Sequence, residues 1–191
     1  VIAYGKGERE KLDLFEAPAA PDGKPAPVVV FIHGGYWQAL DRSFFSWIAP
    51  ALLHHGVSLA VPSYDLCPNV SLSRIVGQMR TLCEGLRERS PLPASGRAHD
   101  RPRPLVTGHS AGGHMAACLL SEGRASGAVA ISGVFDLRPL VHTSLNTALQ
   151  LHANQAAALS PIFWPVPNGA APGGTALDCI VGAAETDAFI D

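Results

Sequence analysis

Ser110 lies in the segment GHSAG, residues 108–112, which fits the pattern G-x-S-x-G. That pattern marks a nucleophile elbow when a strand precedes the serine, a helix follows it and small residues surround it, because the backbone turns tightly there. PLVTG before the serine is typical of a strand, HMAACLL after it is typical of a helix, and Ala111 and neighbouring glycines are small. We therefore predict that the Ser110 hydroxyl is a nucleophile for acyl transfer.

A second motif, HGGYW at residues 33–37, follows an apolar run early in the chain. An acyl-transfer enzyme must stabilise the oxyanion of a tetrahedral intermediate, and preorganised backbone N–H groups do this. A glycine pair lets the backbone approach the substrate closely. We predict that Gly34 and Gly35, together with Ala111, form an oxyanion hole.

The other residues of the HGGYW motif each allow two interpretations. Tyr36 and Trp37 are candidates for lining the substrate pocket, and packing beneath the loop is the alternative. We interpret His33 as a residue that orients the loop rather than as a general base.

The acid of a catalytic triad is expected after a strand that follows the serine. The run LDCIVG at 177–182 precedes Glu185 and Asp187. We prefer Glu185 because it comes three residues after the run, near the end of the strand, and keep Asp187 as the alternative. Asp136 is a third candidate, which we interpret as a cap for the next helix.

The general base is the missing part of this site. No histidine follows Asp187, while His142 and His152 precede the acid. His109 and His114 flank the serine too closely to act as its base, so we assign them to packing and hydrogen bonding. A serine hydroxyl without a base is a weak nucleophile. Either the catalytic histidine lies outside these 191 residues or the protein is not a working hydrolase.

The apolar pattern indicates the elements that would position these residues. Short apolar runs recur at the interval typical of βα units. These runs are 12–15, 28–34, 58–64, 104–108, 127–133 and 177–182. Several lack alternation, as expected for strands of a parallel sheet that is covered on both faces.

Helical periodicity fills the intervals between these runs. Apolar residues share one face of 69–89, with Asn69 or Ser71 as the cap. A helix is expected to start after Asp41 and to be kinked or divided by Pro50. Further helices are expected after Ser110 and over about 143–159. The sequence therefore predicts one α/β domain over 1–191, incomplete at both ends, with a mostly parallel central sheet and helices on both faces.

Composition narrows the classes of partner. Hydrophobic residues make up 47%, charged residues 16%, and the net charge is −2. Without a basic cluster or a long apolar run, we expect no nucleic acid and no membrane as partners. The cysteines are Cys67, Cys83, Cys118 and Cys179. Their wide spacing predicts buried free thiols in a cytoplasmic protein and no metal site.

Five segments together resemble the kynurenine formamidases (arylformamidases) of the α/β-hydrolase superfamily. They are HGGYW (33–37), GHSAGGH (108–114), ISGVFDLRPL (131–140), LSP (159–161) and GAAET (182–186) followed by Phe189. They run over most of the chain in the family's order. The chain differs at Thr186, where the family often has serine, and in stopping before the family's catalytic histidine.

The resemblance implies a small-molecule substrate of tryptophan catabolism. An N-formyl aromatic amine such as N-formylkynurenine would be hydrolysed to release formate, with no metal or organic cofactor. By the resemblance, Ser110 stands at the position of the family's nucleophile and Glu185 at the position of its acid. The HGG segment and Ala111 stand at the position of its oxyanion site.

Two other hypotheses stay open at the level of sequence. A carboxylesterase that acts on small acyl or aryl esters would use the same elbow and oxyanion hole. A binding protein of the same fold that lacks the base would keep the pocket without catalysis. Unpaired sheet edges favour association, so a homodimer is an alternative to a monomer.

Overall fold

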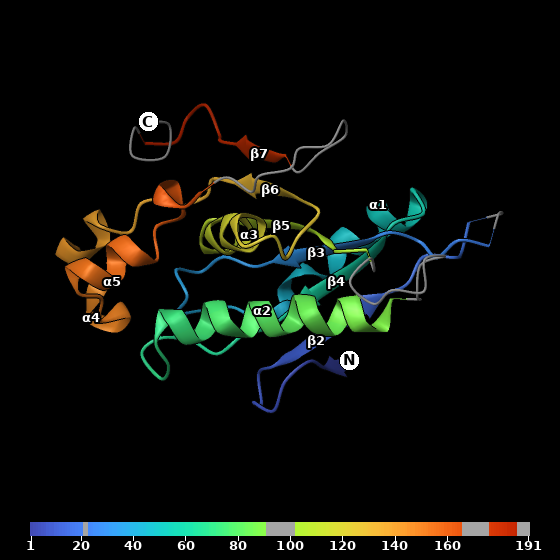
Figure 1. Ribbon diagram of the computed structural model, residues 1–191, viewed down its shortest axis with the longest axis horizontal. Coiled ribbons are helices and arrows are strands. Elements are labelled where there is room, and N and C mark those ends of the chain that lie inside the picture. Colours follow the sequence, from blue (N-terminus) through green and yellow to red (C-terminus); the bar gives the residue numbers. More distant parts are fainter. Residues whose placement is uncertain (21–22, 91–101, 166–175, 187–191) are drawn as a thin grey trace.

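A seven-stranded sheet forms the centre of the computed structural model, which describes residues 1–20, 23–90, 102–165 and 176–186 (Figure 1). Its strands are β1 (Ile2–Ala3), β2 (Lys11–Phe15), β3 (Val28–Ile32), β4 (Ser58–Pro62), β5 (Leu105–His109), β6 (Gly127–Ile131) and β7 (Leu177–Ile180). Their order across the sheet is β1-β2-β4-β3-β5-β6-β7. β2 is antiparallel to β1 and β4, and the remaining pairs are parallel. The prediction of a mostly parallel sheet is confirmed.

All six predicted strands are present, within a few residues of their expected bounds. The short strand β1 was not predicted, because two residues are too few to show a pattern. Parallel pairing brings the carboxyl ends of β3, β5, β6 and β7 to one edge of the sheet. The HGG motif, Ser110 and Glu185 all follow these ends, so the topology brings the three predicted parts of the site to the same edge.

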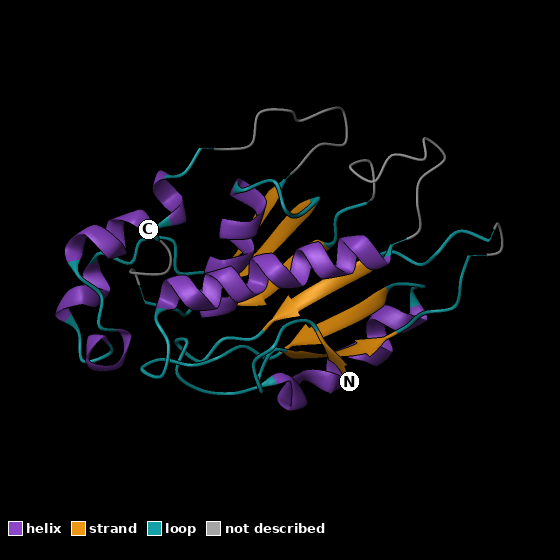
Figure 2. Ribbon diagram, turned by 60° about the horizontal axis from the view of Figure 1, so that its bottom comes forward, coloured by secondary structure: helices purple, strands orange, loops and turns teal. Residues whose placement is uncertain are grey.

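Side chains of β3 alternate between two apolar layers. Val30 and Ile32 belong to the larger core, which includes buried residues of α2 (Leu72–Arg89) and α3 (Ala111–Ser121). Phe31 belongs to a smaller core on the other face, covered by the 3-10 helix η1 (Arg42–Ile48) and by α1 (Ala49–His54). Figure 2 shows the long helix α2 lying across one face of the strands. Helices on both faces are thus confirmed.

The expected helix starts follow from local hydrogen bonds. Ser71 caps α2 by accepting a hydrogen bond from the Arg74 N–H at 3.3 Å, which selects it over Asn69. Asp41 caps η1 through the Ser43 N–H at 2.7 Å. Pro50 lies in the first turn of α1, where its missing N–H costs nothing. The helix expected after Asp41 is therefore divided just before Pro50, into η1 and α1.

The prediction of one helix over 143–159 is wrong. The chain forms η3 (Pro139–His142), α4 (Asn146–Leu149), α5 (Ala153–Ala158) and η4 (Pro161–Phe163), which gather at one end of the sheet (Figure 1). Gln150 has a φ of +52° and ends α4. The Asn146 side chain accepts the Leu151 N–H at 2.7 Å, so a local polar contact replaces a helical hydrogen bond.

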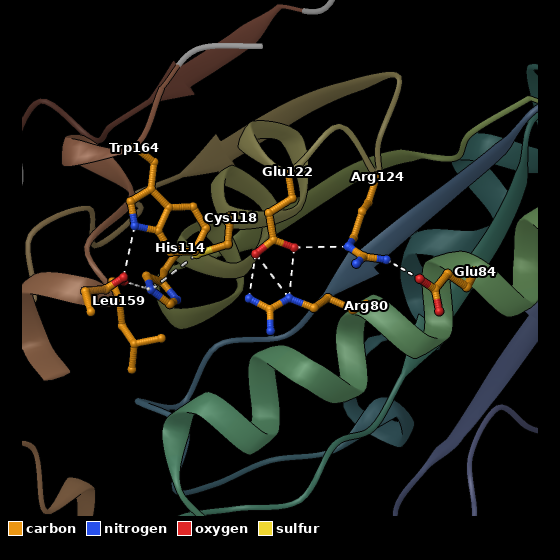
Figure 3. Close-up of polar contacts among 9 residues, drawn as sticks. Arg80, Glu84, His114, Cys118, Glu122, Arg124, Leu159 and Trp164 are labelled. Carbon is orange, nitrogen blue, oxygen red and sulfur yellow. Dashed lines mark hydrogen bonds and ion pairs between the residues drawn. The ribbon is translucent and has the colours of Figure 1, made fainter.

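Ion pairs connect the two helices of the larger core. Arg80 of α2 donates twice to Glu122 at the end of α3, at 2.5 Å through Nη2 and 2.8 Å through Nε (Figure 3). Arg124 donates to Glu122 at 3.1 Å and also pairs with Glu84. These four side chains are partly exposed, so the network orients α2 on α3 more than it stabilises the fold.

The prediction of buried free thiols is confirmed for three of the four cysteines. Cys67, Cys83 and Cys118 are buried and free, and burial raises the pKa of the Cys67 thiol to about 11. Cys179 is free but exposed on the edge strand β7, so the expectation of burial is wrong there. None of the described helices is both long and apolar enough to cross a membrane.

Candidate active site

Ser110 occupies the corner between β5 and α3. Its backbone has a φ of +54° and a ψ of −114°, a region that a residue with a side chain adopts only at an energetic cost. The hydroxyl makes no hydrogen bond to any residue in the described ranges, although the serine as a whole is only 7% exposed. A strained serine with an unpaired hydroxyl at the end of a strand has the geometry expected of a nucleophile elbow.

The glycines beside Ser110 let α3 approach β3 closely. A Cβ built on Gly112 would lie 1.9 Å from the Ile32 carbonyl oxygen, and one built on Gly108 would lie 2.6 Å from the same atom. Gly113 is less tightly confined and meets a different segment: a Cβ there would lie 2.9 Å from the Cα of Gly133, which follows β6. Only glycine fits at these contacts, so the motif fixes the distance between the elbow and the segment that follows β3.

Gly34 lies directly against the elbow. A Cβ built on it would be 3.3 Å from the Ser110 Cβ and 2.8 Å from the His109 carbonyl oxygen. Gly35 has a φ of +97°, which favours glycine. Among the described residues, no backbone hydrogen bond uses the N–H groups of Gly34, Gly35 or Ala111. The loop after β3 and the first residue of α3 therefore both hold amides without a backbone partner close to Ser110.

His33 holds the loop from within the core. Its Nδ1 lies 2.8 Å from the Gly34 carbonyl oxygen, which can only accept, so Nδ1 carries the proton. Burial lowers the pKa of His33 to about 4. A neutral, fully buried imidazole bonded to its own loop fits the predicted orienting role and not that of a base.

The sequence motifs did not indicate a role for Tyr64. It follows β4, is 0% exposed, and stacks on the His33 ring with centroids 4.2 Å apart. Its hydroxyl donates to the carbonyl oxygens of His33 at 2.8 Å and Gly34 at 3.2 Å. The available signal was a tyrosine at the carboxyl end of a buried run, because a buried phenol needs a polar partner.

The two aromatic residues of the motif differ in position. Trp37 is 0% exposed and its ring meets the His114 ring edge to face, with centroids 5.1 Å apart. This is the packing alternative, and the prediction that Trp37 lines the pocket is wrong, because its side chain reaches no open surface. Tyr36 is half-buried with a φ of +49° and remains a candidate for contact with substrate.

The histidines beside Ser110 also differ. His109 is exposed, whereas His114 is buried on α3 and its Nε2 lies 2.8 Å from the Leu159 carbonyl oxygen (Figure 3). Burial lowers the pKa of His114 to about 4. None of the described histidines hydrogen-bonds to the Ser110 hydroxyl. His114 therefore connects α3 to the end of α5.

Glu185 lies beyond the end of β7, where a loop returns it to the neighbouring strand. Its Oε1 accepts hydrogen bonds from the Ser132 hydroxyl at 2.5 Å and the Gly182 N–H at 3.1 Å. These bonds, Ser132 first, lower the pKa of Glu185, with a smaller contribution from His109. Ser132 itself follows β6 with a φ of +48°. The carboxylate is thus held ionised at the edge of the sheet that carries Ser110.

The other acids are not part of this arrangement where the structure describes them. Asp136 accepts hydrogen bonds from the Arg138 N–H at 2.9 Å and from its guanidinium at 2.7 Å, which lower the pKa of Asp136. It stabilises the turn before η3, close to its predicted capping role. Asp187 lies outside the described residues. No cluster of three or more histidine, cysteine or acidic side chains within the described ranges has the arrangement of a metal site.

Comparisons with known proteins agree with this fold. The alpha/beta hydrolase fold family matches residues 29–166. Kynurenine formamidase of Salmo salar is 32% identical over 169 residues, which are 84% of this chain and 54% of that protein. That of Drosophila melanogaster is 30% identical over 175 residues, with coverages of 85% and 55%. The chain spans about half the length of these relatives.

Solved structures show the same fold. A candidate thioesterase from Silicibacter sp. TM1040 is 36% identical with a TM-score of 0.81, and the match covers 100% of this chain and 68% of that one. Esterase 2 of Thermogutta terrifontis, bound to propionate, has a TM-score of 0.67 at 19% identity, with coverages of 95% and 82%. With the family match spanning most of its length and a strained serine at the turn from β5 to α3, this chain belongs to the α/β-hydrolase fold family.

Proposed function

We propose that the protein is a serine hydrolase that cleaves N-formyl aromatic amides through a formyl-enzyme at Ser110. The observation that carries the proposal is the contact between the elbow and the glycine loop. The Ser110 hydroxyl is unpaired among the described residues, and Gly34 approaches so closely that a Cβ there would lie 3.3 Å from the Ser110 Cβ.

In this reaction the Ser110 Oγ attacks the formyl carbon, and its proton passes to a general base. The carbonyl oxygen becomes an oxyanion that the N–H groups of Gly34, Gly35 and Ala111 stabilise. The C–N bond then breaks, and the leaving aromatic amine takes the proton from the base. Water attacks the formyl ester next, so that formate leaves and the serine hydroxyl is restored.

The proton relay is assigned in two parts. Glu185 is the acid, because hydrogen bonds from Ser132 and Gly182 keep its carboxylate ionised and fixed. We place the general base outside the described residues, since no described histidine reaches the Ser110 hydroxyl. A carboxylate of this kind would hold the imidazole in the required tautomer and stabilise its charged form.

The proposed substrate class is based on the similarity to known proteins. The similarity to kynurenine formamidases at 30–32% identity favours an N-formyl aryl amide. The candidate thioesterase, at 36% identity, favours an esterase as the second candidate function. Both reactions pass through the same tetrahedral intermediate, so one elbow and one oxyanion hole serve either substrate.

Steady-state kinetics on the full-length protein distinguish the formamidase from the esterase. We expect kcat/KM on N-formylkynurenine to exceed that on p-nitrophenyl acetate, and Ser110→Ala to abolish both activities. A large preference for the ester would reject the formamidase assignment and retain the hydrolase. Activity in Ser110→Ala equal to that of the wild type would reject the serine mechanism itself.

A further inference from the structure

Tyr64 holds both peptide carbonyls of the loop that carries Gly34 and Gly35. Its hydroxyl has a single proton, which it shares between the His33 oxygen at 2.8 Å and the Gly34 oxygen at 3.2 Å. The Gly34 oxygen also accepts the His33 Nδ1–H at 2.8 Å. Two side chains therefore fix the direction of two consecutive peptide groups.

The direction of these carbonyls sets the direction of the amides. In a trans peptide the C=O and the following N–H point to opposite sides. Because the His33 carbonyl points at the Tyr64 hydroxyl, the Gly34 N–H points away from it, and the Gly34 carbonyl fixes the Gly35 N–H in the same manner. Neither amide has a backbone partner among the described residues.

Tyr64 is itself held rigidly. Its ring stacks on His33 at an interplanar angle of 11°, and the Arg9 Nε donates to its carbonyl oxygen at 2.7 Å. The second arm of the Arg9 guanidinium donates to the Leu40 carbonyl at 2.6 Å, so one side chain connects Tyr64 to the far end of the glycine loop. Burial raises the pKa of Tyr64, which keeps the hydroxyl protonated and able to donate.

We propose that Tyr64 is a positioning residue for the oxyanion hole: its hydroxyl, through the carbonyls of His33 and Gly34, aims the Gly34 and Gly35 N–H groups toward Ser110. This inference rests on the proposed function. It assigns a role in the reaction to a side chain that itself makes no contact with the reacting atoms. A phenylalanine would fill the same space, so the role belongs to the hydroxyl.

The chain offers a matched control. Tyr4 also donates its hydroxyl to a backbone carbonyl, that of Ser63, at 2.5 Å, and burial raises its pKa as well. Its partner lies outside the glycine loop. That carbonyl belongs to the peptide before Tyr64, so Tyr4→Phe removes a hydrogen bond of the same kind beside Tyr64 and leaves the bonds of the Tyr64 hydroxyl to His33 and Gly34 in place.

The test compares Tyr64→Phe with Tyr4→Phe in the full-length protein. We expect Tyr64→Phe to lower kcat for p-nitrophenyl acetate about 10-fold or more with KM within about twofold, since loss of a whole donor costs about 100-fold to 1,000-fold. Tyr4→Phe should leave both constants within about twofold of wild type. A kcat for Tyr64→Phe equal to that of Tyr4→Phe would overturn the positioning role.

A second readout separates this inference from the proposed function. In a ¹H–¹⁵N spectrum, the Gly34 and Gly35 amide resonances should move in Tyr64→Phe and stay in place in Tyr4→Phe. A wild-type protein without hydrolase activity would reject the proposed function, and the spectrum alone would then decide. Amide resonances that do not move in Tyr64→Phe would overturn the inference in either case.

Discussion

Replacing Gly34 with alanine tests the close approach of the glycine loop to the elbow. The new Cβ would lie 2.8 Å from the His109 carbonyl oxygen and 3.3 Å from the Ser110 Cβ. A carbon and a carbonyl oxygen normally stay about 3.3–3.6 Å apart, so the loop or the elbow must move by about half an ångström. The contact is with backbone, which cannot rotate away as a flexible side chain would.

Gly34→Ala should lower both the free energy of unfolding and kcat. Overpacking of this kind costs about 1–3 kcal/mol of the free energy of unfolding. The same displacement moves the Gly34 amide relative to the Ser110 Oγ. Because a misplacement of about 1 Å can cost about 100-fold in rate, we expect kcat to decrease about 10-fold to 100-fold.

Urea unfolding and ester hydrolysis measure the two effects. Gly77→Ala is the control, since a Cβ on Gly77 within α2 would meet nothing within 4 Å. Alanine is the better helix former, so this variant should gain about 0.5–1 kcal/mol of stability and keep its kcat. Wild-type stability and kcat in Gly34→Ala would refute the placement of the loop against Ser110.

Three further predictions concern titratable and charged side chains. Ser132→Ala should raise the pKa of Glu185 toward that of an ordinary carboxyl, seen as a shift in the NMR titration of its side-chain carbon; an unchanged titration would contradict the hydrogen bond. His114, with a pKa lowered to about 4, contributes stability that is complete above the ordinary histidine pKa and is lost as pH falls toward 4. Between pH 7 and pH 5 the free energy of unfolding should therefore drop by about 2 kcal/mol from this residue, and urea titrations of His114→Gln should show a smaller drop than wild type. Arg80→Gln should cost at most about 1 kcal/mol in the same assay, because its pair with Glu122 is partly exposed, and a larger loss would assign the pair a greater role.

The strands and the elbow could be predicted because their signals are local. The run before Ser110 is apolar, the residues around it are small, and the residues after it form a helix, so the sequence alone indicates the turn. The order of the parallel strands then brings Gly34 and Glu185 to the same edge. Pro50 and Asp41 likewise act on their own neighbours, and the divided helix follows from them.

Features that depend on particular side-chain contacts, near or far along the chain, were not predictable in this way. The break at Gln150 depends on how the Asn146 side chain meets the Leu151 N–H after the chain has turned. Tyr64 acquires its role only because β4 pairs with β3 and places its hydroxyl against the glycine loop. Trp37 is apolar enough for either a pocket or a core, and only its packing on His114 decides between them.

Reaction of the full-length protein with a fluorophosphonate, followed by mass spectrometry and peptide mapping, tests the central assignment most directly. An activated serine forms a covalent adduct, whereas an ordinary buried hydroxyl does not. We predict one adduct per chain, located on Ser110 and absent from Ser110→Ala. An unlabelled Ser110, or equal labelling of the Ser110→Ala variant, would show that this residue is not the nucleophile.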